Sequence, residues 1–460
     1  MSSITDLLRA AWNAVDPVIP LPSGDPRYVD CKDVRGGDAA EEMRGIITWS
    51  NRNVSLLVTG HRGCGKSTEL LRLKSKLEED GYCVLYFAAD EDLDMNDTIY
   101  SDLLLAVARR IVTDLCADHG ITLDENLLEK VQEWFGTTLY EQTEWERVQT
   151  ELDTEARLGI GLPSGMPLLA RVLARVTGQI RTGQMVKKDI RLKLDPQLSL
   201  LIANINLLIG KATEQLRRKG YKGLVLLIDN LDRITYRVVD GGRTSHEALY
   251  IDHGPQLCSL ACHVVYTVPI SMLYTPTATQ LTAIFPEKVF VPMIKVKEPD
   301  GKECKPGLDS LRVMLRLRIP EIDTLFSPGA VERLIRASGG HPRDLMRLVR
   351  YACTYARREE GITPIDEEVA ERAVGVLTED FGRMVPEEHY PKLARVHIRK
   401  QVENDVDHQM MLYNLSVLEY RNGKAPWHDV HPAVEELPKF REAWKREQGQ
   451  GKPRARKKAD

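Results

Sequence analysis

The segment Gly60–Ser67 constrains the fold of this chain more than any other feature of the sequence. It fits the phosphate-binding pattern G-x-x-x-x-G-K-[ST] at every fixed position. An apolar run over residues 54–59 predicts a short buried strand that enters the segment, and residues 67–81 predict a helix that leaves it. A strand, a glycine-rich loop and a helix in this order predict a loop that cradles phosphate groups.

The residue types of this loop suit an anion. Glycines let consecutive backbone N–H groups curl around phosphate oxygens, and the helix N-terminus adds a favourable field. Lys66 can reach the β- and γ-phosphates, and the Ser67 hydroxyl can ligate Mg²⁺. We therefore expect ATP with Mg²⁺ as cofactors, and we assign nucleotide binding to Gly60, His61, Arg62, Gly63, Cys64, Gly65, Lys66, Ser67 and Thr68.

A second apolar run, residues 224–228, ends in Asp229. Five consecutive apolar residues are typical of a central parallel strand that is covered on both faces. Ligands bind at the carboxyl edge of such sheets, where this acid would lie. Asp229 is therefore the predicted partner of Ser67 in holding Mg²⁺.

Length and composition favour a multidomain protein without a membrane anchor. The 460 residues predict two or three domains, and 43% apolar with 28% charged residues is typical of globular proteins. Uninterrupted apolar runs stay below membrane-spanning length, and the N-terminus lacks the features of a secretory signal. The eight cysteines are scattered without a zinc spacing. We expect reduced cysteines and a cytoplasmic location.

Charge is unevenly distributed although the net charge is only −4. Residues 125–156 carry about −7, residues 157–193 about +7, and the last twenty residues about +5. One interpretation is a set of solvated helix faces with a disordered basic tail. The other is a basic surface that meets nucleic acid, an acidic partner or a neighbouring subunit.

Further strands are predicted at residues 83–88, 262–268 and 288–296, with helices between them, so the fold class is α/β with a parallel sheet. The later pattern is helical, and residues 415–420 and 427–430 predict a hairpin around a loose turn at 421–426. The expected domains are an N-terminal helical approach segment (1–50), a core (51–300) with a helical insertion at about 120–215, a helical lid (301–378), a winged-helix-like domain (379–446) and a disordered basic tail (447–460).

The order of these elements resembles the AAA+ superclass, specifically its STAND and origin-recognition-like ATPases. The matching segments are Gly60–Ser67, Asp229–Arg233, Thr267 and Gly340–Arg343. The resemblance implies a P-loop NTPase sheet with a helical lid and a C-terminal winged-helix-like domain. It also implies that Thr267 ends the sensor strand, that Pro342 belongs to the lid motif, and that Arg343 touches the γ-phosphate. The catalytic candidates are Lys66, Asp229, Asn230, Asp232, Thr267 and Arg343.

Three departures from that family pattern bear on activity. Many AAA+ enzymes have Glu after the metal-binding Asp, but Asn230 stands there and cannot take a proton, which leaves Asp232 as the nearest acid. Arginine is absent from residues 244–311, where an arginine finger would fall; Arg181 or Arg191 would have to supply it. No effector domain or repeat sensor is recognisable, so a separate effector or sensor protein is the expected partner.

Two functions remain open at this point. The first is a homo-oligomeric, slowly hydrolysing ATPase that acts as a switch or assembly platform for a partner protein; the resemblance implies a role in bacterial antiviral defence. The second is a DNA-associated ATPase similar to origin-recognition or transposition regulators. A small-molecule kinase is a third and weaker alternative, because no substrate pocket can be named.

Overall fold

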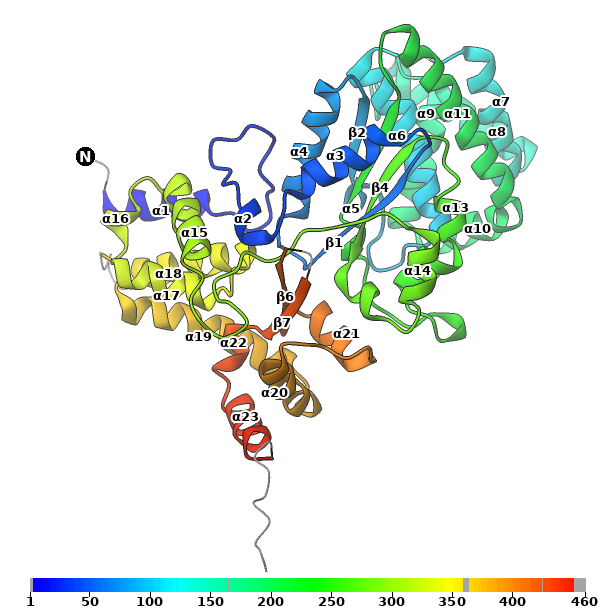
Figure 1. Ribbon diagram of the computed structural model, residues 1–460. Coiled ribbons are helices and arrows are strands. Elements are labelled where there is room, and N and C mark those ends of the chain that lie inside the picture. Colours follow the sequence, from blue (N-terminus) through cyan, green and yellow to red (C-terminus); the bar gives the residue numbers. More distant parts are fainter. Residues whose placement is uncertain (1–2, 122, 164, 359–363, 424, 451–460) are drawn as a thin grey trace, which may run out of the picture.

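The computed structural model describes residues 3–121, 123–163, 165–358, 364–423 and 425–450. Its centre is a five-stranded parallel sheet in the order β2-β3-β4-β1-β5 (Figure 1). Because all strands run in one direction, their carboxyl ends meet at one edge of the sheet. The predicted α/β class is confirmed. The strands are β1 (Ser55–Gly60), β2 (Cys83–Ala88), β3 (Leu224–Asp229), β4 (His263–Pro269) and β5 (Lys288–Phe290).

The bounds of β2 and β3 agree with the sequence prediction, but the fifth strand is much shorter than predicted. We expected it at 288–296, and β5 ends at Phe290. Pro292 has no N–H to donate to a neighbouring strand. Beyond it, the N–H of Met293 lies 3.4 Å from the carbonyl oxygen of Glu419, so the chain turns from the sheet toward the C-terminal hairpin.

Helices cover both faces of the sheet (Figure 1). On one face α3 (Ala39–Trp49) packs against α4 (Lys66–Glu79), the helix that leaves the phosphate loop. On the other face α6 (Tyr100–His119) and α11 (Leu198–Arg218) pack against each other and against β2 and β3. Coverage on both sides explains why the strands are apolar without alternation.

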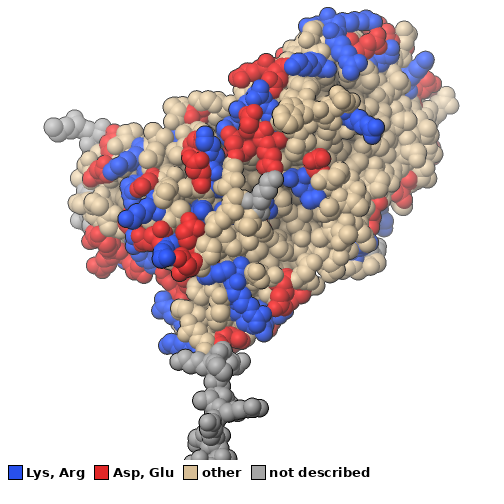
Figure 2. Space-filling model, viewed as in Figure 1, with Lys and Arg blue, Asp and Glu red and all other residues tan. Residues whose placement is uncertain are grey.

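The helical insertion brings the acidic and basic segments together. It consists of α7 (Glu125–Leu139), α8 (Gln142–Arg157), α9 (Leu168–Thr182) and α10 (Gln184–Leu194). Arg175 of α9 pairs with Glu151 and Glu155 of α8 at 3.0 and 3.1 Å. On the face shown in Figure 2, basic and acidic side chains lie next to one another. Much of the basic run is therefore neutralised within the chain.

A helical lid follows the sheet. It consists of α15 (Lys305–Arg318), α16 (Ile322–Leu325), α17 (Pro328–Ala337), α18 (Pro342–Arg358) and α19 (Glu367–Met384). The expected boundary at residue 378 falls inside α19. The N-terminal helix α1 (Ile4–Ala14) packs on α18 and buries Leu8 and Ala11 in the apolar core of the lid. The beginning of the chain thus belongs to the lid rather than to the sheet.

The C-terminal unit combines helices with a hairpin. It contains α20 (Tyr390–Arg399), α21 (Val406–Tyr413), β6 (Val417–Asn422), β7 (Ala425–Val430), α22 (Pro432–Glu435) and α23 (Pro438–Gln450). The loose turn predicted at 421–426 is wrong, because β6 and β7 pair to Asn422 and Ala425. The predicted disordered tail begins too early, since α23 runs to Gln450; residues 451–460 lie outside the described residues. This unit lies against both the sheet and the lid (Figure 1).

Short helices complete the core: α2 (Lys32–Arg35), α5 (Ala89–Asp92), α12 (Ser245–Glu247), α13 (Gly254–Leu257) and α14 (Ala278–Ile284). Among the described residues, one helical stretch, Met185–Arg218, has the length and apolar composition needed to cross a membrane. It spans α10 and α11. One face of α11 packs on α6 and buries Leu201, Ile205 and Leu208.

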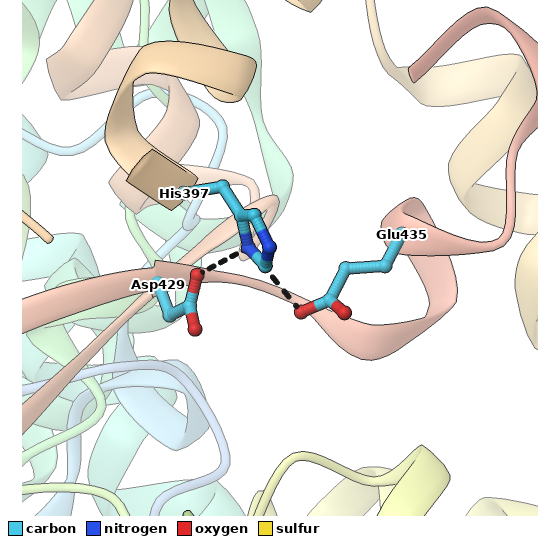
Figure 3. A group of neighbouring side chains, drawn as sticks. All are labelled: His397, Asp429 and Glu435. Atoms are coloured by element: carbon cyan, nitrogen blue, oxygen red, sulfur yellow. Dashed lines mark hydrogen bonds and ion pairs between the residues drawn. The ribbon is translucent and has the colours of Figure 1, made fainter. Parts of the chain in front are cut away.

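An ion-pair network fixes the C-terminal unit. The fully buried Asp429 of β7 accepts a hydrogen bond from His397 of α20 at 2.8 Å, and Glu435 of α22 lies beside them (Figure 3). These are metal-ligand residue types, but Lys297 and Lys400 already contact the Asp429 carboxylate at 2.7 and 2.6 Å. The ammonium groups take the place that a cation would need, so the cluster is structural.

Replacing Asp429 should destabilise the protein. Asp429→Ala leaves Lys297 and Lys400 without their shared carboxylate, and we expect a loss of about 3 kcal/mol, the lower end of the range for breaking a buried pair. The measurement is urea unfolding. The control is Asp300→Ala, which removes the surface pair with Lys302 and should change stability far less. Equal losses in both variants would contradict the structural role of the network.

Candidate nucleotide-binding site

A cavity of about 320 Å³ lies where the phosphate loop, the tip of β3, the lid and the N-terminal segment meet. It is bounded by six cationic side chains, namely Arg27, Arg62, Lys66, Arg233, Arg318 and Arg343, and by three carboxylates, Asp16, Asp229 and Asp232. The excess of positive charge suits a polyanionic ligand. The remaining boundary comes from loop residues Gly63, Gly65, Ser67 and Thr68, from Asn230, Pro342 and Met346, and from residues 13–14 and 17–21.

The loop has the backbone conformation that its glycines allow. Gly63 and Gly65 adopt φ values of 89° and 109°, in the left-handed region that side chains disfavour. Gly65 precedes α4, and no side chain caps that helix. The free N–H groups of its first turn are therefore available to an anion at the cavity.

Lys66 lies folded over the loop. Its ammonium donates to the carbonyl oxygens of Gly60 and His61, both at 2.9 Å, and contacts Asp232 at 3.0 Å. Burial alone would raise the pKa of Asp232, but the Lys66 charge holds that pKa below its ordinary value. Asp232 is thus engaged as the counter-ion of the loop lysine and is a weak proton acceptor in this arrangement.

Ser67 and Asp229 lie together. The Ser67 hydroxyl lies close enough to the Asp229 carboxylate to lower its pKa, and this carboxylate accepts from the Tyr86 hydroxyl at 2.8 Å and from the Asn230 N–H at 2.7 Å. Burial raises the pKa of Asp229, and the charge of nearby Asp232 adds to this effect. A hydroxyl and a carboxylate are hard oxygen donors, so this pair fits Mg²⁺.

Asn230 follows β3, and Thr267 lies beside this turn in β4, but only Asn230 reaches the cavity. Asn230 adopts φ 63°, a strained value for a residue with a side chain. The Thr267 hydroxyl accepts from the N–H of Leu231 at 2.9 Å and lies 3.4 Å from the Ile228 carbonyl oxygen. Thr267 is fully buried and is not among the cavity residues. It holds the turn that presents Asn230.

The lid closes over the loop through its Gly-His-Pro-Arg segment. The ring Nε2 of His341 donates to the carbonyl oxygen of Arg62 at 2.7 Å. A side chain at Gly63 would collide with the Cβ of Arg343 at 2.7 Å, so the approach is close. Arg343 donates to the carbonyl oxygen of Pro17 at 3.2 Å. Burial, together with the charges of Arg233 and Arg62, lowers the pKa of Arg343. A bound anion would reduce the unfavourable free energy of holding this charge here.

Three loop residues assigned to nucleotide binding do not line the cavity: Gly60, His61 and Cys64. The buried ring of His61 contacts the carbonyl oxygen of Leu412 through Nδ1 at 3.2 Å and accepts from the Glu419 N–H through Nε2 at 2.8 Å. Cys64 is buried in the apolar core, and its carbonyl oxygen accepts from Arg35 at 2.8 Å. These side chains anchor the loop, and His61 links it to the C-terminal unit.

Sequence reasoning missed part of this site. Residues 17–21 form one of its sides, and the Leu21 N–H donates to the Thr68 hydroxyl at 3.3 Å. This segment carries no motif that could have identified it. Arg27 and Arg318 were also missed, since each is one arginine among many. Asp90 could have been found, because it follows a predicted strand just as Asp229 ends one.

Comparison with known proteins adds little. No family model matches the sequence, and no curated protein matches it. The similar solved structures include a Walker-type ATPase of Pyrococcus abyssi (13% identity, 92% of this chain and 98% of that chain, TM-score 0.39) and Cdc6p of Pyrobaculum aerophilum (10% identity, 95% and 98%, TM-score 0.33). Similarity at these values does not extend to function.

Removing the loop lysine should weaken nucleotide binding. We expect Lys66→Ala to lower ATP affinity by at least about 100-fold, because Lys66 would contact two phosphates. Lys66→Ala also leaves Asp232 buried without its partner, so the double variant Lys66→Ala, Asp232→Asn is needed to retain the fold. The measurement is titration calorimetry with ATP. Lys74→Ala, on the same helix but paired at the surface, is the control. Wild-type affinity in the folded double variant would refute the assignment.

The ionised Asp229 carboxylate should lower the stability of the fold, and it should be required for metal-dependent turnover. Its folded-state pKa is raised, so its ionisation destabilises the fold as the pH rises through that pKa. Asp229→Asn cannot ionise, and at neutral pH without Mg²⁺ it should be more stable than wild type. Its Mg²⁺-dependent turnover should fall by more than about 100-fold. Thermal unfolding and ATPase assays test both, with the exposed Asp118→Asn as control. A less stable variant with unchanged turnover would contradict this role.

Proposed function

We propose that this chain is an ATP-binding, slowly hydrolysing ATPase that acts as a nucleotide-dependent switch for a partner protein. One observation carries the proposal: the phosphate loop is bound directly by both the lid and the C-terminal unit. His341 of the lid segment donates to the Arg62 carbonyl oxygen, and the His61 ring bonds to the backbone of α21 and β6. A ligand that changes the loop therefore acts on both neighbours.

The cavity chemistry supports a nucleoside triphosphate with Mg²⁺. Lys66 and the free N–H groups of α4 suit the β-phosphate, and Ser67 with Asp229 suit the metal. Arg233 and Arg343 lie at the same cavity and are suited to a γ-phosphate. We assign adenine rather than guanine because the sequence contains no Asn-Lys-x-Asp run.

The same site supports slow hydrolysis. Asn230 lines the cavity where an acid would accept the proton of the attacking water, and an amide cannot do so. Asp232, the acid expected to substitute for it, is bound to Lys66. A protein that keeps ATP for a long time is suited to a switch rather than to continuous turnover.

Both arginines suggested as arginine fingers are engaged in contacts away from the cavity. Arg191, one proposed arginine finger, contacts Asp97 at 2.9 Å and also Asp102 of α6, and Arg181 bonds to the Glu91 carbonyl oxygen. We therefore propose a homo-oligomer in which another arginine reaches the γ-phosphate, and a separate effector or sensor protein. Eight free cysteines suit a cytoplasmic location.

The alternative, a DNA-associated ATPase, fits this conformation less well. In a winged-helix domain, the helix before the hairpin and the hairpin itself would face DNA. Here the helix before the hairpin, α21, packs on residues 270–274, and Gln409 donates to the Tyr274 carbonyl oxygen at 3.0 Å. Glu419 of β6 accepts from the Tyr274 hydroxyl at 2.6 Å. These surfaces face the core instead, so we expect little salt-dependent binding to duplex DNA.

The switch is tested by hydrogen exchange. We expect ATP to increase amide exchange over residues 411–420 relative to ADP, since γ-phosphate contacts displace the lid and release the hairpin. Arg343→Ala should erase the difference between the two nucleotides and lower the preference for ATP by about 1.5–3 kcal/mol. Arg383→Ala, on the exposed face of α19, is the matched control. Identical exchange with ATP, with ADP and without nucleotide would refute the switch.

A further inference from the structure

An acid from a second strand lies beside Asn230. Asp90 is in α5, directly after β2, and the register of the sheet pairs Ala88 of β2 with Asp229 of β3. Asp90 therefore lies at the carboxyl edge of the sheet, next to the tip of β3. The Asn230 Nδ2 donates to one oxygen of the Asp90 carboxylate at 2.8 Å, and Arg233 donates to the other at 2.7 Å.

This contact fixes the orientation of the Asn230 amide. A carboxylate only accepts hydrogen bonds, so the amide nitrogen must face Asp90, and the amide oxygen is the atom left free. Asn230 lines the cavity, whereas Asp90 is not among the lining residues. The acceptor that Asn230 can offer to a ligand in the cavity is thus its Oδ1. Arg233, held by the same carboxylate, also lines the cavity.

The other acids of the site are already engaged. Asp229 lies beside Ser67, accepts from Tyr86 and from the N–H of Asn230, and is suited to the metal. Asp232 is the counter-ion of Lys66. Asp90 is therefore the acid that remains to act on Asn230, and its side chain is 29% exposed.

We propose that Asp90 is a positioning residue for ATP hydrolysis: it holds Asn230 Oδ1 as the acceptor that orients the attacking water, and it holds Arg233 toward the phosphates. This rests on the proposed ATPase function. The water oxygen bonds to the γ-phosphorus while the bond from phosphorus to the β–γ bridging oxygen breaks, and that electron pair stays on ADP. An amide cannot take the water proton, so the proton passes to an oxygen of the departing phosphate.

An exchange of the two side chains tests the proposal. Asp90→Asn should lower kcat by about tenfold with KM unchanged, because the amide of Asn230 loses its fixed orientation. Asn230→Asp should also be slow at neutral pH, because two carboxylates would meet at hydrogen-bonding distance. The double variant Asp90→Asn, Asn230→Asp restores an amide–carboxylate pair and places the acid at the cavity. Its kcat should exceed that of wild type by at least about tenfold, within the contribution of a general base.

The controls separate this inference from the proposed function. Glu91→Gln alters the adjacent surface acid, which pairs with Arg110, and should leave kcat unchanged. Calorimetry should show that every variant still binds ATP, so that the kcat values can be compared at saturating ATP. In the double variant, kcat should rise with pH as the new acid at position 230 ionises. Wild type has an amide at this position and should not show this rise. A double variant no faster than Asn230→Asp, or an unchanged kcat in Asp90→Asn, overturns the role of Asp90. Absence of ATP binding by wild type would instead refute the ATPase proposal.

Discussion

The ring of His61 is the contact on which the arrangement of the domains depends. It stands in the phosphate loop, yet both of its nitrogens bond to the C-terminal unit. Nδ1 faces a carbonyl oxygen and Nε2 faces an N–H group, so only the neutral ring with a proton on Nδ1 satisfies both. Burial lowers the pKa of His61 to about 3, which keeps this form at physiological pH. The contact therefore responds to the shape of the loop rather than to acidity.

A second histidine makes a complementary contact. His341 faces two acceptors, the Asp344 carboxylate at 2.7 Å and the Arg62 carbonyl oxygen at 2.7 Å. Burial alone would raise the pKa of Asp344, but its contact with His341 holds that pKa well below its ordinary range. The lid is thus tied to the back of the loop through this ring. Adjacent loop residues are bound by two different domains, so the loop joins the lid to the C-terminal unit.

Local sequence patterns predicted the sheet and the centre of the site. They did not predict contacts between residues that are far apart in the chain. The strands at 83–88 and 224–229 were found because apolar runs and turn residues are local signals, and the loop glycines and Asp229 belong to motifs. His61 was assigned to phosphate binding from its place in the motif, whereas its side chain bonds to residues 351 and 358 positions away. A pattern within one segment carries no information about such a partner. For the same reason the basic run at 157–193 suggested an open surface until its acidic partners were located.

The contacts that Lys66 already makes affect how a nucleotide would bind. Its ammonium is already satisfied by two carbonyl oxygens and by Asp232, all within 3.0 Å. Phosphate binding must break that ion pair, and it leaves Asp232 buried with one cation fewer. The loss of the Lys66 ion pair therefore offsets part of the attraction between Lys66 and a phosphate. The remaining binding free energy must come from other cations, such as Arg62 and Arg343. The described structure holds no carboxylate within ion-pair distance of these two arginines. Because Arg343 belongs to the lid and Arg62 to the loop beneath it, their contribution is largest when the two move toward the same anion. Under the proposed function, the affinity for a nucleotide and its action on the lid would thus arise from the same charges.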